Sequence, residues 1–191
     1  MTNVLVLSSG GIDSTACLSY YISNGYSPSA MWVDYGQIAK VPELKAVKAV
    51  TEHFNIPLKI IKLQGIQWFL AKSGNEFRGR NLLLASIGAC SFPASHGLIA
   101  MGIHEGTDYQ DSSTNFQKEI DTLVRTVSND CLAMDFPFGE LTKIDIAAYC
   151  KKMDVPIHLT YSCLRGVVPP CEHCLACQDR REVIYYENIS T

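Results

Sequence analysis

Short runs of apolar residues alternate along the chain with longer segments in which apolar residues recur at helical spacing. The short runs predict buried strands, and the longer segments predict helices. The predicted strands span residues 4–7, 30–33, 58–63 and 98–103, with a short apolar piece at 131–136; the predicted helices span residues 14–22, 43–54, 82–92, 114–127 and 142–153. Repeated alternation of this kind favours an α/β fold with a doubly wound, mostly parallel sheet covered by helices on both faces.

The 191 residues contain no internal repeat and no low-complexity linker, so we expect one domain over residues 1–191. Two stretches rich in glycine and polar residues, 64–81 and 105–113, are the expected loops. The last part of this domain, residues 160–187, stands apart because of its cysteines and is expected to form a metal-binding C-terminal segment.

Sixteen Lys and Arg residues against nineteen Asp and Glu residues give a net charge of −3. A broad nucleic-acid surface usually needs an excess of basic residues, so we expect no direct contact with nucleic acid and favour a small-molecule substrate. The sequence contains no apolar stretch long enough to cross a membrane and begins with no secretory signal pattern. We therefore expect a cytoplasmic protein without a membrane partner.

Eight cysteines are many for a protein expected in a reducing compartment, where disulfides are rare. Four of them stand alone among apolar or small residues and are predicted to lie in the core as small hydrophobic side chains. They are Cys17, Cys90, Cys131 and Cys150.

The other four cysteines fall close together in a Cys-x7-Cys-x2-Cys-x2-Cys pattern. They are Cys163, Cys171, Cys174 and Cys177. Four thiolates in so short a span can complete a closed tetrahedral zinc site, which would be structural because no position remains for a substrate. An iron–sulfur cluster uses the same ligands and stays open as an alternative. His173 lies between the ligands and is expected to be a bystander.

A glycine pair, Gly10-Gly11, follows the first predicted strand and precedes the first predicted helix. Glycines let the backbone turn tightly, and the helix that follows presents free N–H groups to an anion. The segment lacks the lysine of a P-loop, so it is no Walker motif. An ordinary turn in which Asp13 or Ser14 caps the helix is the structural alternative.

The six residues 9–14 read Ser-Gly-Gly-Ile-Asp-Ser. They resemble the SGGxDS loop of the PP-loop superfamily, the N-type ATP pyrophosphatases, whose fold is also called adenine nucleotide alpha-hydrolase-like. The resemblance implies that ATP is cleaved between its α and β phosphates with the help of Mg²⁺. It also implies that ATP is held by Ser8, Ser9, Gly10, Gly11, Ile12, Asp13, Ser14, Thr15, Ala16, Cys17 and Leu18.

More blocks follow in a fixed order. They are Asp34-Tyr35-Gly36-Gln37, Gly79-Arg80-Asn81, Asp108-Tyr109-Gln110-Asp111, Leu141-Thr142-Lys143, Thr160-Tyr161-Ser162-Cys163 and Arg180-Arg181. With the SGGxDS loop and the cysteines, this series resembles the 7-cyano-7-deazaguanine synthase family over nearly the whole chain. The resemblance implies conversion of 7-carboxy-7-deazaguanine and ammonia to the nitrile through an adenylated acid and an amide. It also implies a homodimer with one structural Zn²⁺ per chain.

The resemblance further suggests roles for single residues. Asp13, Ser14, Arg80 and Lys143 are the expected catalytic residues. Arg80 and Lys143 would contact phosphate or carboxylate, although surface ion pairs are the alternative for both. Tyr35, Asn81 and Asp111 are the expected substrate-binding residues. Asp111 would accept hydrogen bonds from the guanine-like edge, whereas Tyr35 could equally be a core aromatic.

Two stretches depart from the family pattern. After Gln37 the family shows Arg-His and then an acidic residue, whereas this chain has Ile38-Ala39, and its nearest acid, Glu43, is offset. After Asp111 an Arg and a Glu of the family are replaced by neutral residues within 112–115. These changes leave open a related ligase that passes the adenylated acid to another amine, for instance on a protein in antiviral defence. A non-catalytic nucleotide-binding protein would not need the whole SGGxDS loop.

Overall fold

The computed structural model describes residues 2–65, 77–105 and 109–189. Its strands are β1 (Asn3–Leu7), β2 (Pro28–Asp34), β3 (Leu58–Lys62), β4 (Gly97–Met101) and β5 (Leu132–Asp135). Its helices are α1 (Ile12–Ser23), α2 (Lys40–His53), α3 (Arg80–Cys90), α4 (Thr114–Val127), α5 (Lys143–Lys152) and α6 (Leu175–Ile189), with short 3-10 turns at Gln110–Ser112 and Ile157–Leu159.

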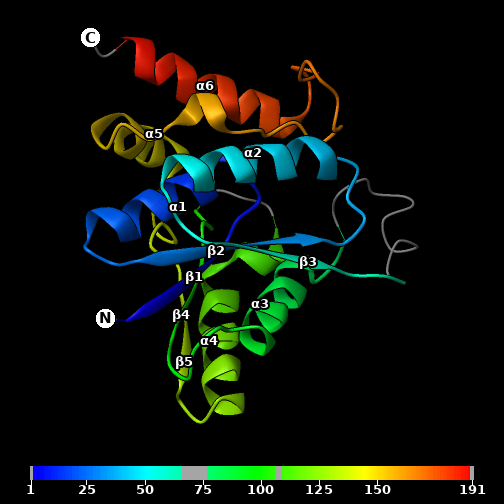
Figure 1. Cartoon of the computed structure of the whole chain (residues 1–191). Coiled ribbons are helices and arrows are strands. Elements are labelled where there is room, and N and C mark those ends of the chain that lie inside the picture. The colour runs from blue at the N-terminus through cyan, green and yellow to red at the C-terminus, as the bar shows by residue number, and fades with distance from the viewer. Residues whose placement is uncertain (1, 66–76, 106–108, 190–191) are drawn as a thin grey trace.

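The five strands form one sheet in the order β3-β2-β1-β4-β5, and every neighbouring pair is parallel. Helices α1 and α2 cover one face of this sheet and α3 and α4 cover the other, as Figure 1 shows. Helices α5 and α6 pack against each other and form a further layer outside α1. The expected doubly wound α/β fold is confirmed.

Alternate residues of each central strand enter two separate cores. On β1, Val4 and Val6 face α1 and α5, whereas Leu5 and Leu7 face α3 and α4. All four are nearly inaccessible, which is typical of a parallel strand buried on both faces and explains its continuous apolar sequence.

Strand order reverses between β1 and β4, because the chain moves outward from β1 to β3 and then returns to the other side of β1. In open parallel sheets, ligands bind outside the carboxyl ends of the strands at such a switch point. The glycine turn after β1 lies at this position.

The predicted elements agree with the observed ones to within a few residues, and the predicted helix over 114–127 is α4 itself. The predicted loop 64–81 ends early, because Arg80 and Asn81 already belong to α3; residues 66–76 and 106–108 of the two predicted loops lie outside the described residues. Helix α6 was not predicted. Its apolar residues do not mark one clear face, since Val183 is fully buried whereas Leu175, Ile184 and Tyr185 are exposed.

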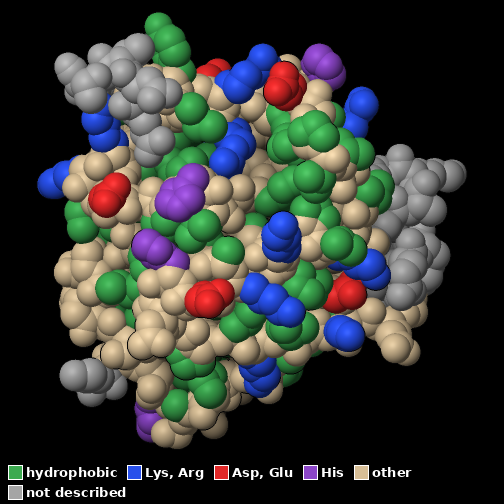
Figure 2. All heavy atoms as spheres, turned by 45° about the horizontal axis from the view of Figure 1, so that its top comes forward, with side chains coloured by type: hydrophobic (Ala, Val, Ile, Leu, Met, Phe, Trp, Pro, Cys, Tyr) green, Lys and Arg blue, Asp and Glu red, His purple; other side chains and the backbone are tan. Residues whose placement is uncertain are grey.

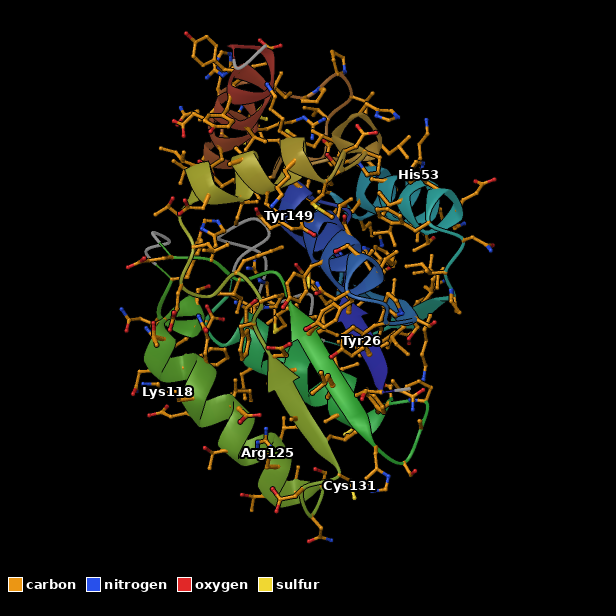
Figure 3. The ribbon with its side chains drawn as sticks, turned by 90° about the vertical axis from the view of Figure 1, so that its left-hand side faces the viewer. Tyr26, His53, Lys118, Arg125, Cys131 and Tyr149 are labelled. Carbon is orange, nitrogen blue, oxygen red and sulfur yellow. The ribbon has the colours of Figure 1, made fainter. Side chains whose placement is uncertain are left out.

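The prediction that four lone cysteines lie in the core is right for Cys17 and Cys150 and wrong for Cys90. Cys90 is exposed because it ends α3, where the helix leaves the sheet. Cys131 is half-buried and lies in the turn between α4 and β5, at the end of the molecule farthest from α6 in Figure 3.

Among the described residues, no helix combines the length and the apolar character that crossing a membrane requires. On the face shown in Figure 2, Lys and Arg side chains are interspersed with apolar and acidic ones.

A buried hydrogen bond ties α1 to the far side of the sheet. The Tyr21 hydroxyl donates to Asp135 Oδ2 at 2.5 Å, and Tyr21 is only 1% exposed. Burial and this bond to Asp135 raise the pKa of Tyr21, so the phenol stays protonated as the donor.

We expect Tyr21→Phe to lower the free energy of unfolding by about 1–3 kcal/mol, because the Asp135 carboxylate loses a donor in a buried position. Urea denaturation measures the change. Tyr26→Phe is the matched control, since Tyr26 is exposed and its ring packs edge-on against that of Tyr21. Equal, small changes in both variants would show that the bond does not stabilise the fold.

Candidate active site

A cavity of about 1050 Å³ opens at the carboxyl ends of β1, β2 and β4. Its wall is built from the turn after β1, the end of β2, the first turns of α3 and α5, residues 161–164 and the first half of α6. This volume is at the upper end of the range for small-molecule sites, so it has room for two ligands side by side.

The glycine turn forms one side of the cavity. Gly11 precedes α1 and no side chain caps the helix, so the alternative in which Asp13 or Ser14 is the cap is wrong. Ser14 Oγ instead donates to the Gly11 carbonyl at 3.1 Å, and the hydroxyls of Ser9 and Ser14 lie 3.4 Å apart. The first amides of α1, which have no acceptor within the helix, therefore stand beside two hydroxyls.

Gly10 is held between two other segments of the chain. It has a φ of +76°, and a Cβ there would lie 2.9 Å from the Glu43 carbonyl oxygen and 3.0 Å from side-chain atoms of Ala46 and Val47. From the opposite side, the Tyr161 N–H donates to the Gly10 carbonyl at 2.9 Å. Only glycine fits this conformation and this close approach to α2.

The remaining predicted ATP contacts divide into two groups. Ser8, Ile12 and Asp13 line the cavity with Ser9, Gly11 and Ser14. Thr15, Ala16, Cys17 and Leu18 are not part of the wall, since each is 0% exposed inside the core that α1 makes with the sheet.

Asp13 and Lys143 form an ion pair in the wall of the cavity. Lys143 is the first residue of α5, which a capping box of Thr142 and Asp145 fixes in place, and its Nζ donates to Asp13 Oδ1 at 2.5 Å. Both side chains are largely covered, at 17% and 29% exposure, so the surface alternative for Lys143 does not apply. A cation is thus placed next to the turn that offers free amides.

Helix α6 adds acidic residues to this part of the wall, which the sequence analysis did not predict. Asp179 and Glu182 both line the cavity. Burial raises the pKa of Asp179, while the nearby Lys143 lowers it and Asp13 raises it further. Lys143 therefore lies within a small group of carboxylates that a divalent cation could share.

Arg80 lines the cavity from the start of α3, next to Asn81, and Asn81 is held by Asp111. The Asn81 backbone N–H donates to Asp111 Oδ2 at 2.9 Å, and Asn81 Nδ2 donates to the Asp111 carbonyl at 2.8 Å. Asp111 itself is not part of the wall, although the neighbouring Ser112 is. Its contact with substrate stays a prediction, and its observed contacts fix the end of α3.

Tyr35 is both a core residue and a wall residue, since it is 8% exposed and packs edge-on against Phe77. Two wall residues near it were not predicted, Gln37 and Glu43. Gln37 Nε2 donates to Glu43 Oε2 at 2.9 Å, so the acid that is offset in the sequence reaches the block of residues 34–37. Gln37 lay within a quoted block and could have been found there.

The four C-terminal cysteines come together as predicted. Their sulfur atoms all lie within 4.8 Å of one another, and those of Cys171 and Cys177 are 4.0 Å apart. A tetrahedral zinc with bonds of about 2.3 Å needs sulfur atoms about 3.8 Å apart. Burial raises the pKa of Cys163, but hydrogen bonds from backbone N–H groups bring it to about 6, which favours the thiolate that a metal requires.

The sequence pattern of a family described as "Queuosine biosynthesis protein QueC" matches residues 3–76 and 74–186. The chain belongs to the QueC family. The 7-cyano-7-deazaguanine synthase of Pseudoalteromonas translucida is 28% identical over 211 residues, which cover 98% of this chain and 95% of that protein. The 7-cyano-7-deazaguanine synthase 2 of Sulfurisphaera tokodaii is 31% identical over 205 residues, which cover 93% of this chain and 44% of that protein.

A solved structure of a predicted subunit of a tRNA methyltransferase from Methanocaldococcus jannaschii has a TM-score of 0.54 at 14% identity. The match covers 84% of this chain and 92% of that one. At this identity the likeness concerns the fold alone. The expected family and PP-loop fold are confirmed, and the chain has the four-cysteine group in place for a metal. The homodimer and the cytoplasmic location stay predictions.

We expect Gly10→Ala to lower the affinity for an ATP analogue by at least about tenfold, because the new Cβ pushes the loop away from α2. Isothermal titration at a temperature where the variant is folded measures the affinity. Gly25→Ala is the matched control, since Gly25 has a similar φ of +80° with nothing within 4 Å of an added Cβ. Equal affinities in the two variants would mean that the close approach at Gly10 is unimportant.

Proposed function

We propose that the protein converts 7-carboxy-7-deazaguanine and ammonia to 7-cyano-7-deazaguanine at the expense of two ATP. In the first step the substrate carboxylate attacks the α phosphate, and pyrophosphate leaves. Ammonia then displaces AMP to give the amide. A second ATP activates the amide oxygen, and loss of AMP and a proton gives the nitrile. The observation that carries this proposal is the SGGxDS turn at the switch point of a QueC-family sheet, with Lys143 beside it.

Such a reaction needs positioning and charge stabilisation more than acid–base chemistry. The amides at the start of α1 and the hydroxyls of Ser9 and Ser14 would hold the pyrophosphate group. Lys143 and Arg80 would balance the negative charge of the α phosphate as the bond to it breaks. The carboxylate of Asp13 suits Mg²⁺, which would neutralise the pyrophosphate that leaves.

In this proposal Asp111 acts indirectly, through its hydrogen bonds with Asn81. Because it fixes the backbone and the side chain of Asn81, it keeps Arg80 at the mouth of the cavity. The neutral residues that depart from the family pattern are engaged locally: Ser113 caps α4, and Asn115 donates to Glu119. They supply no charge to the substrate.

We expect Lys143→Met to reduce the rate of AMP formation on the order of 10²-fold or more, the loss that removal of one preorganised donor typically causes. The assay is separation of AMP from ADP after incubation with ATP, Mg²⁺ and 7-carboxy-7-deazaguanine. Lys118→Met is the control, because Lys118 points outward from α4 in Figure 3. Release of ADP and phosphate by the unchanged protein would contradict the proposal.

The amine acceptor is tested separately by mass spectrometry of the products. Conversion to the nitrile with ammonia alone supports the synthase. Adenylation of the acid without amide or nitrile, together with conjugation to an added protein amine, would favour the related ligase instead.

We propose that the four cysteines hold one zinc ion per chain. Cys174→Ser should lose the metal and lower the yield of folded protein, because metal binding to such a site supplies folding free energy. Elemental analysis of the purified protein measures the metal. Cys90→Ser is the control, since Cys90 is exposed and lies on α3, away from this group. Iron with visible absorbance would show a cluster in place of zinc.

A further inference from the structure

Two polar atoms in the wall of the cavity lack partners. Among the described residues, three buried side-chain polar atoms make no hydrogen bond, and Trp32 Nε1 and Ser8 Oγ belong to the wall. The third, the hydroxyl of Tyr149, lies on α5 and is not part of the wall (Figure 3). Trp32 is 3% exposed and Ser8 is 4% exposed. A buried polar group without a partner loses its hydration without compensation, so these groups suggest a ligand.

Glu43 supplies the complementary group. One carboxylate oxygen, Oε2, accepts the hydrogen bond from Gln37, and the described contacts show no hydrogen bond to the other. Burial raises the pKa of Glu43, whereas Gln37 and the nearby Trp32 indole lower it, although the indole falls short of hydrogen-bond geometry. The indole N–H and the Glu43 carboxylate thus lie close together without forming a full hydrogen bond.

Gln37 holds this carboxylate in a fixed orientation. It is 2% exposed, and both ends of its amide are engaged. Its Oε1 accepts from the Tyr35 N–H at 3.0 Å, and its Nε2 donates to the Val33 carbonyl at 3.0 Å as well as to Glu43. Because Gln37 is anchored to the end of β2, the free oxygen of Glu43 is preorganised for a ligand.

Two donors, the Trp32 N–H and the Ser8 hydroxyl, lie in the same wall as one acceptor, the Glu43 carboxylate, and this combination limits which ligands can bind. A phosphate would accept from the indole and the Ser8 hydroxyl but would be repelled by Glu43. An ammonium ion would suit Glu43 but offers nothing to the indole N–H. A heterocycle edge that carries N–H donors next to a carbonyl oxygen satisfies both.

We infer that Glu43, Trp32 and Ser8 bind the ring edge of the deazaguanine acid, with Glu43 accepting from its N–H groups and Trp32 donating to its carbonyl oxygen. This inference rests on the proposed function. The position of Glu43 also supports the inference, because its carbonyl packs against Gly10 of the proposed phosphate-binding turn. A substrate held there has its own carboxylate next to the α phosphate.

The test compares two ligands in two proteins. The ligands are 7-carboxy-7-deazaguanine and its analogue without the exocyclic amino group, and the proteins are the unchanged chain and Glu43→Gln. We expect the unchanged protein to prefer the amino compound by about tenfold. We expect Glu43→Gln to lose this preference, because the neutral amide is a weaker acceptor than the carboxylate and its NH2 group must face either the Gln37 NH2 group or the ligand N–H groups. Affinity for α,β-methylene-ATP, measured by the same titration, should change by less than about twofold.

Two further variants keep the test decisive. Glu52→Gln changes an exposed glutamate on the same helix and should leave both affinities unchanged. Trp32→Phe keeps the ring but removes the N–H, so it should weaken binding of both acids by about tenfold without changing the preference between them.

Equal weakening of α,β-methylene-ATP and the acid in Glu43→Gln would overturn the inference and assign Glu43 to the nucleotide. An unchanged preference for the amino compound would overturn it as well, while AMP formation by the unchanged protein would leave the proposed function standing. If the unchanged protein neither binds the acid nor forms AMP with it, both proposals fail together.

Discussion

The site depends on how closely the backbone at Gly10 can approach its neighbours. The turn after β1 is held by the Tyr161 N–H on one side and by the first turn of α2 on the other. The Glu43 carbonyl and the Tyr161 N–H are backbone groups, so these two contacts cannot be relieved by a side-chain rotation. Three parts of the chain that are distant in sequence are thereby fixed around one turn. The amides at the start of α1 then point into the cavity without any need for a capping side chain.

Positively and negatively charged side chains lie close together around that turn. Lys143 comes from α5 and Asp13 from α1, while α6 brings Asp179 to the same wall. Because Lys143 is paired with Asp13, its largely covered ammonium group is compensated, whereas an unpaired one would be costly to desolvate. The ion pair is therefore compatible with the proposed binding of a polyphosphate at this turn.

The sequence predicted those parts of the fold and site that have local signals. Strand 4–7 and helix 114–127 follow from periodicity, and the phosphate-binding turn and the cysteines follow from spacing within a few residues. The contact between Glu43 and Gln37 could not be predicted, because it depends on how α2 begins, which the spacing in the sequence does not determine. Trp32 was not considered at all, since a tryptophan in an apolar strand looks the same whether or not its N–H has a partner.

Helix α6 connects the cysteine group to the cavity, two features for which the sequence analysis predicted no connection. It begins within the cysteine group and continues as a wall of the cavity, and the segment before the cysteines reaches Gly10 through Tyr161. A metal held by these four cysteines would tie the segment before them to the start of α6. The cysteine group, the glycine turn and one side of the cavity therefore depend on one continuous segment, residues 161–182.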